Sequence, residues 1–120
     1  MKAIRFYGPK NLKYEEVTYP KLDDDSVIIK VHCASICNGS DIALYSGKRD
    51  FLVAYSWMKI PWIMGHESAG EIVQIGKEVK GFKIGERVAS LKYGGAFAEY
   101  QAVNPNELIK IPEGLPYDLA

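Results

Sequence analysis

The sequence predicts a mostly β fold built as one domain. Short segments with alternating or continuously apolar residues are separated by glycine, proline and asparagine, a pattern typical of strands joined by turns. Segments with the helical spacing of apolar residues are scarce. The chain has 120 residues, and a domain of this size buries roughly two thirds of the surface that its unfolded form exposes.

The expected strands follow one another along the whole chain. In the first strand Ile4 and Phe6 alternate with a polar neighbour, and the Gly8-Pro9 pair after them predicts a turn. Most of the later strands are bounded in a similar way, by glycine or by an Asn-Pro-Asn sequence. The predicted strands cover residues 2–7, 26–35, 67–76, 87–91, 96–103 and 107–112.

Residues 26–35 give the clearest strand, and its alternation separates the two cysteines of the chain. Cys33 falls on the apolar face and is predicted to be an ordinary core residue. His32 shares the other face with Lys30, so it is predicted to be an exposed strand residue and not a ligand. Cys37 lies past the end of the strand, in a loop, where a thiol of a protein without export features is a candidate ligand or nucleophile.

Two other segments are less regular. Residues 38–65 are rich in aromatic side chains and their pattern does not define a fold, although a helical turn is compatible with residues 40–45. Near the end of the chain, Pro116 and Asp118 suit the first turn of a helix. Since an isolated helical turn is unstable in water, this ending suggests a domain separated from something longer.

Charge and hydropathy exclude several classes of partner. Fifteen basic residues balance 15 acidic ones, without a block of like charge, so we expect no nucleic acid and no anionic membrane as a partner. No stretch resembles a signal peptide or approaches the ~20 apolar residues of a membrane span. We therefore expect a cytoplasmic protein with a small-molecule partner.

Cys37, His66 and Glu67 are the candidate metal ligands. A soft thiolate with an imidazole favours zinc over magnesium or calcium, which prefer oxygen ligands. By residue type alone the prediction is weak, because a loop cysteine and a Gly-His-Glu triplet can be unrelated. If His66 and Glu67 start a strand, their side chains point to opposite faces. One would then ligate, and the other would approach from behind or stay uncommitted.

Several motifs together resemble the medium-chain zinc-dependent alcohol dehydrogenases. "GHESAGEIVQIGKEV" is similar to their zinc signature, "ICNGSD" to their metal-binding loop, "GFKIGERVA" to their Gly-Asp-Arg-Val turn and "GGAFAEYQAV" to the strand that follows it. The resemblance covers residues 1–120 and implies the N-terminal catalytic domain of an alcohol or polyol dehydrogenase. The implied fold is a GroES-like, partly open β-barrel with short helices.

The resemblance also implies roles for individual residues. The Cys37 thiolate and the neutral His66 imidazole would bind a catalytic zinc, and Glu67 would lie beside or behind the ion, able to step in as a ligand. Asp41 would accept a hydrogen bond from His66 and fix its orientation. Ser40 would relay the substrate proton. Because the loop has one residue more than the family pattern, Ser40 or a displaced neighbour could occupy the relay position.

Other implications concern the substrate and the cofactor. Tyr45, Phe51 and Trp57 would lie near the substrate cleft, although aromatic residues in a long loop are equally often core or interface residues. Hydride would pass from the zinc-bound alcohol to NAD or NADP in a Rossmann domain, and no Gly-x-Gly-x-x-Gly is present for one. The family's remaining zinc ligand would lie beyond residue 120, and no four-cysteine structural zinc lobe is present. The fragment alone is expected to be inactive, and the full-length enzyme to be a homo-oligomer.

Two other functions remain open from the sequence. One is a GroES-like binding or assembly module without catalysis, which would not need Cys37, His66 and Glu67. The other is a zinc-free quinone-type reductase domain of the same superfamily, which would not require that combination either.

Overall fold

The computed structural model describes residues 1–120, and it confirms the mostly β fold. Two short α-helices and two 3-10 turns connect or follow the strands. The strands are β1 (Lys2–Gly8), β2 (Asn11–Glu16), β3 (Val27–Ala34), β4 (Trp62–Ile63), β5 (Ser68–Ile75), β6 (Arg87–Ser90), β7 (Tyr100–Val103) and β8 (Leu108–Lys110). The helical elements are α1 (Ser40–Ser46), α2 (Arg49–Ala54), η1 (Pro105–Glu107) and η2 (Tyr117–Leu119).

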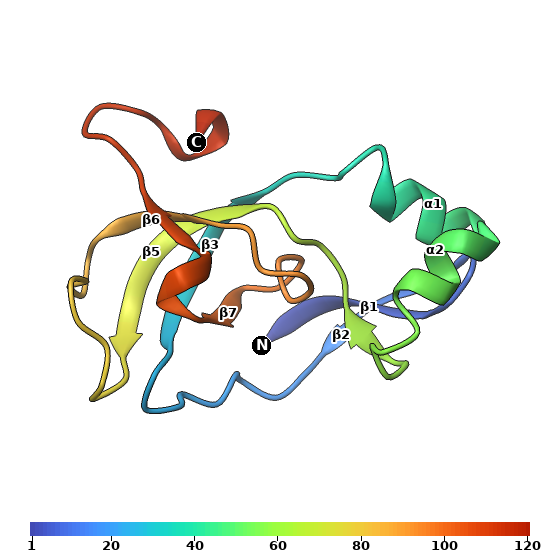
Figure 1. Cartoon of the computed structure of the whole chain (residues 1–120), viewed down its shortest axis with the longest axis horizontal. Helices are drawn as coiled ribbons and strands as arrows, with labels where there is room; N and C mark the ends of the chain where they lie inside the picture. The colour runs from blue at the N-terminus through green and yellow to red at the C-terminus, as the bar shows by residue number, and fades with distance from the viewer.

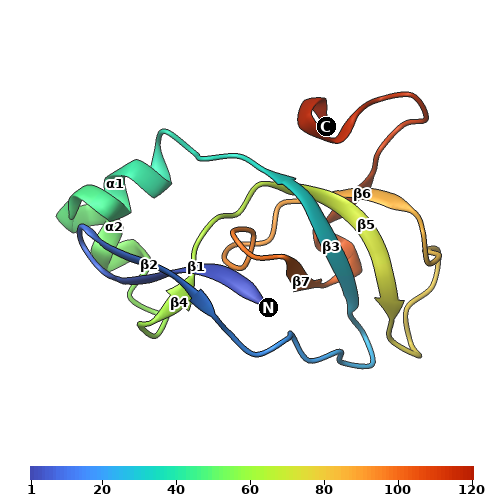
Figure 2. The ribbon, with the colours of Figure 1, turned by 180° about the vertical axis from the view of Figure 1, so that it is seen from behind.

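The strands form two antiparallel sheets. The small sheet has the order β2-β1-β4, and the large sheet has the order β7-β3-β5-β6-β8. Figure 1 shows the large sheet at one end of the molecule and α1 and α2 at the other, with β1 and β2 between them. The view from behind shows the same order, with β4 beside β1 (Figure 2).

The two sheets are joined by the segment that precedes β7. The backbone N–H of Ile4 in β1 donates to the carbonyl of Phe97 (2.8 Å), and the N–H of Val31 in β3 donates to the carbonyl of Glu99 (2.9 Å). The predicted strand 96–103 is therefore a ladder strand only in its second half, because its first half bridges the sheets. The result is a partly open barrel, as the sequence predicted.

Two hydrophobic clusters lie inside these sheets. The small cluster consists of Phe6, Leu44 and Met64, under α1 and α2. The large cluster consists of Val27, Ile29, Ile72, Val88, Val103 and Leu108.

Cys33 belongs to neither cluster. It is only partly buried and lines an open surface hollow of about 940 Å³, so the prediction that it is an ordinary core residue was wrong.

The elements that the sequence did not predict contain no fully buried residue. Five of the six residues of β2 are exposed, and α2 contains no buried residue. β4 has only two residues. A pattern of apolar residues arises only where one face is buried, so these segments carry no such pattern.

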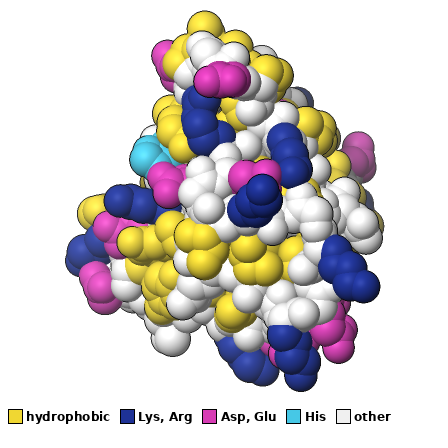
Figure 3. All heavy atoms as spheres, turned by 90° about the vertical axis from the view of Figure 1, so that its left-hand side faces the viewer, with side chains coloured by type: hydrophobic (Ala, Val, Ile, Leu, Met, Phe, Trp, Pro, Cys, Tyr) yellow, Lys and Arg dark blue, Asp and Glu magenta, His cyan; other side chains and the backbone are white.

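The surface and the chain end add little to the positioning of the site. Figure 3 shows basic and acidic side chains interspersed around a hydrophobic area, without a patch of one sign on that face. None of the helices has the length and hydropathy needed to cross a membrane. At the chain end, the ring of Tyr117 stacks on His32 with 4.4 Å between centroids, and the Arg87 guanidinium lies 4.3 Å from the Tyr117 centroid.

Candidate metal centre

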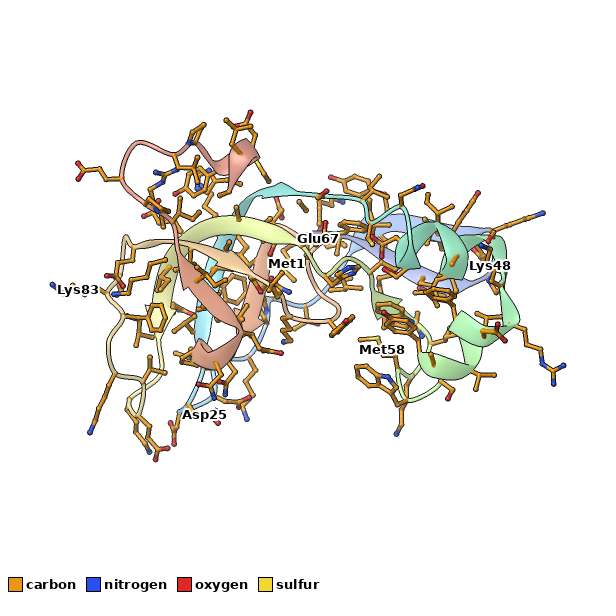
Figure 4. All side chains as sticks on the ribbon, turned by 45° about the horizontal axis from the view of Figure 1, so that its top comes forward. Met1, Asp25, Lys48, Met58, Glu67 and Lys83 are labelled. Carbon is orange, nitrogen blue, oxygen red and sulfur yellow. The ribbon has the colours of Figure 1, made fainter.

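The candidate ligands come from two loops that meet where the large sheet adjoins the helices. Cys37 lies between β3 and α1, and His66 and Glu67 lie between β4 and β5. Figure 4 shows Glu67 at this junction, between the sheet and the helical end. The residues of the two loops are far apart in the sequence, and the antiparallel pairing of β3 with β5 brings them together.

The three candidate ligands converge. One ligand atom each of Cys37, His66 and Glu67 lies within 4.8 Å of the other two, and His66 Nε2 is 3.7 Å from Glu67 Oε1. Ligands around a tetrahedral zinc lie roughly 3.3–3.8 Å apart, given metal–ligand distances of about 2.0–2.3 Å. A soft thiol, an imidazole and a carboxylate suit zinc in their chemistry, and the His66–Glu67 pair already has this spacing.

The convergence differs from the expectation that His66 and Glu67 point to opposite faces. β5 begins at Ser68, so His66 and Glu67 both precede the strand and do not alternate across it. Gly65 has a φ of +84°, and a Cβ there would lie 2.5 Å from the Phe97 ring. This glycine therefore allows a sharp turn just before His66, so the side chains of His66 and Glu67 need not point to opposite faces as they would in a strand.

Asp41 connects the two loops from the first turn of α1. Asp41 is 5% exposed, and its Oδ2 accepts a hydrogen bond of 2.9 Å from the backbone N–H of Cys37. Its Oδ1 lies 3.7 Å from Nδ1 of His66, which is longer than a hydrogen bond. The carboxylate thus fixes the Cys37 backbone and faces the imidazole without bonding to it directly.

The Ser40 hydroxyl is buried beside the thiol. Its oxygen has no hydrogen-bond partner within ordinary geometry, although it is close enough to Cys37 to be the strongest influence on the thiol. A buried hydroxyl without a partner costs free energy unless a ligand or water completes it. The extra residue in the loop is thus accommodated with both Cys37 and Ser40 at the site.

The Cys37 thiol is activated by its surroundings. The Ser40 hydroxyl and the backbone N–H groups of Ser40 and Gly39 lower the pKa of Cys37 to about 7, and His66 acts in the same direction. These groups stabilise the thiolate, which is the form that binds metals and reacts as a nucleophile.

The aromatic residues chosen from the sequence lie in different environments. Phe51 packs against the small cluster, whereas Tyr45 and Trp57 are exposed. Their contact with substrate stays a prediction. Sequence reasoning missed Tyr93, whose ring stacks on His66. No local pattern could have indicated it, because the contact joins residues that are far apart in the sequence.

Comparison with known proteins places the chain in a family. Residues 23–113 match the family described as the alcohol dehydrogenase GroES-like domain. The chain belongs to this family. The recognition from sequence motifs and the GroES-like fold are both confirmed by this match.

Several relatives of this GroES-like domain are similar along nearly the whole chain. Acryloyl-coenzyme A reductase of Sulfurisphaera tokodaii is 35% identical over 97% of the chain, and L-threonine 3-dehydrogenase of Bacillus licheniformis is 34% identical over 100% of it. The crystal structure of 2R,3R-butanediol dehydrogenase from Bacillus subtilis superimposes with a TM-score of 0.86 at 31% identity, over 98% of this chain. The chain spans only 41% or 42% of the length of these three proteins.

The lowered pKa of Cys37 gives a testable prediction for the metal-free chain. Alkylation of Cys37 by iodoacetamide requires the thiolate, so its rate should rise with pH around a midpoint near 7. The Ser40→Ala variant should raise that midpoint and leave thermal stability almost unchanged, because the hydroxyl it removes has no other partner. Peptide mass spectrometry separates Cys37 from Cys33. An unchanged midpoint in Ser40→Ala would contradict the role given to the hydroxyl.

Proposed function

We propose that these residues form the zinc-binding catalytic domain of an NAD(P)-dependent alcohol or polyol dehydrogenase. The observation that carries the proposal is the convergence of Cys37, His66 and Glu67 from two distant loops. The family assignment supports it, as do relatives named butanediol and L-threonine 3-dehydrogenase. Alcohols or polyols are therefore the proposed substrate class.

Each residue at the site has a proposed part in holding the metal. The Cys37 thiolate and the His66 imidazole would be ligands, and Glu67 would lie beside them as a further carboxylate donor. Zinc bound there would supply Lewis acidity that brings the pKa of an alcohol toward neutrality. Asp41 would hold the Cys37 backbone through its 2.9 Å hydrogen bond and keep a negative charge near Nδ1 of His66.

Proton transfer is assigned to Ser40. Its hydroxyl is buried, unpaired and adjacent to the thiol, and as a relay its oxygen would accept the hydroxyl proton of the substrate while releasing its own proton toward solvent. Tyr45, Phe51 and Trp57 stay as predicted substrate contacts. Of these, Phe51 also packs against the small cluster, which positions it by contacts inside the domain.

The hydride acceptor is proposed to be NAD or NADP, held outside these residues. No Gly-x-Gly-x-x-Gly occurs in the chain, and the relatives are more than twice as long as the part that this chain matches. The 120 residues alone are thus proposed to be inactive as a dehydrogenase. A cytoplasmic, homo-oligomeric enzyme is the proposed form of the whole protein.

A zinc-free quinone-type reductase domain is the second candidate, because a quinone oxidoreductase from Coxiella burnetii has a similar structure, with a TM-score of 0.83 at 28% identity. Metal analysis separates the two candidates. The purified chain is expected to bind one zinc at saturating metal, because its donor set suits zinc, but only weakly, since the family's remaining ligand would lie outside these residues. A folded chain that binds no zinc even at saturating metal would favour the reductase, and alcohol-dependent NAD(P) reduction by the chain alone would contradict the proposed inactivity.

A further inference from the structure

The imidazole of His66 contacts an aromatic ring in addition to the carboxylates that face its two nitrogens. Its Nδ1 faces Asp41 and its Nε2 faces Glu67, each at 3.7 Å. One face of the ring lies against Tyr93, with 5.4 Å between centroids and 22° between planes. We infer that Tyr93 is a positioning residue that sets the orientation of the His66 imidazole for metal binding, an inference that rests on the proposed function.

Tyr93 also contacts a second aromatic ring, that of Tyr55. The centroid of Tyr55 lies 6.0 Å from that of Tyr93, with the planes inclined by 57°. Tyr55 packs against the small cluster that includes Met64. The Tyr93 ring therefore contacts both the imidazole and a side chain that packs against the core, although Tyr93 is 54% exposed.

A buried hydrogen-bond chain fixes the backbone next to Tyr93. The side-chain amide of Gln101 in β7 donates to the Gly94 carbonyl (2.9 Å), and its carbonyl accepts from the Ser68 hydroxyl (2.9 Å). Gln101 is 2% exposed and Ser68 is 7% exposed. Ser68 begins β5, directly after the candidate ligands. The loop that carries Tyr93 is thus linked through Gln101 to Ser68, two residues after His66.

This arrangement matters because the imidazole lacks the usual fixed partner. A histidine that ligates a metal is normally oriented by a hydrogen bond from its other ring nitrogen. Here the Asp41 oxygen is 3.7 Å from Nδ1, beyond hydrogen-bond distance. Packing against Tyr93 then limits rotation of the ring. Stacking requires the aromatic ring and not the phenol hydroxyl. A phenylalanine at position 93 should therefore still orient the imidazole, whereas a leucine should not.

Nuclear magnetic resonance of the metal-free chain tests whether Tyr93 stacks on His66 in solution. The chain has two histidines, and His32 stacks on Tyr117 at 4.4 Å, which makes it an internal reference. Tyr93→Leu should shift the ring-proton resonances of His66 downfield, because the ring current is lost, and should leave those of His32 unchanged. Tyr93→Phe should leave the ring-proton resonances of both histidines at their wild-type positions. Unshifted His66 resonances in Tyr93→Leu would overturn the inference.

Zinc affinity, measured by competition with a chromophoric chelator, tests the consequence for the metal. Tyr93→Leu should bind zinc about 10- to 100-fold more weakly than the wild type, the range for loss of an orienting partner, and Tyr93→Phe should differ by less than about twofold. Equal affinity in Tyr93→Leu and wild type would overturn the role toward the metal. A wild-type chain that binds no zinc would overturn the proposed function instead, while the resonance experiment still decides whether Tyr93 stacks on His66. Thermal midpoints of the metal-free variants verify that folding is unchanged.

Discussion

Zinc binding is expected to be lost when either Cys37 or His66 is replaced. In Cys37→Ser the thiolate is gone, and in His66→Ala the imidazole is gone, so the converging set keeps only two of its three donors. The affinity should fall by more than the roughly 10- to 100-fold that loss of an outer partner of a ligand costs. Chelator competition and metal analysis of the dialysed protein measure the effect.

The chain supplies a matched control for each variant. Cys33→Ser removes the other thiol and His32→Ala removes the other imidazole, and neither residue belongs to the converging set. Both controls should keep the zinc affinity of the wild type. Retention of zinc at full stoichiometry in Cys37→Ser or His66→Ala would show that the metal binds elsewhere and would remove the proposed function.

Gly70→Ala is expected to destabilise the fold strongly. Gly70 pairs with Val31 across the β3–β5 ladder, and a Cβ at this position would lie 2.2 Å from the backbone carbonyl oxygen of Lys30. Because the clash is with backbone in the centre of the large sheet, no side-chain rotation relieves it. We expect a loss of at least about 3 kcal/mol in the free energy of unfolding, at the upper end for overpacking. Urea unfolding followed by circular dichroism measures this loss.

Gly81→Ala is the comparison that isolates the clash. Gly81 has a φ of +82°, but no atom lies within 4 Å of a Cβ placed there. Its replacement should therefore cost only the backbone strain of about 1 kcal/mol. Equal destabilisation by the two variants would mean that the β3–β5 ladder can widen to admit the methyl group.

The predictable part of the fold is the part with a buried face. β3 and β5 lie side by side inside the large sheet and each has buried apolar residues, and their positions agree with the predicted strands within a residue at each end. β2 was not predicted, since pairing with β1 leaves its side chains exposed. The predicted helix start at the chain end is present only as the 3-10 turn η2.

The site was predictable in its residues but not in its geometry. The motif around His66 and Glu67 identified candidate ligands, and the loop motif identified Cys37. Their spacing depends on the turn at Gly65 and on where β5 begins, and a period-two argument cannot give the position of a strand end. The stack of Tyr93 on His66 also depends on tertiary structure alone.

The candidate ligands lie at the seam between two separately packed hydrophobic clusters. Small proteins often open in such cooperative units, and a seam is where one unit can separate from another. An ion bound by both loops, through Cys37 and through His66 and Glu67, would link the two clusters across that seam. Amide hydrogen exchange in the helical end and in the large sheet should then slow together on zinc loading, because the two parts could no longer open separately.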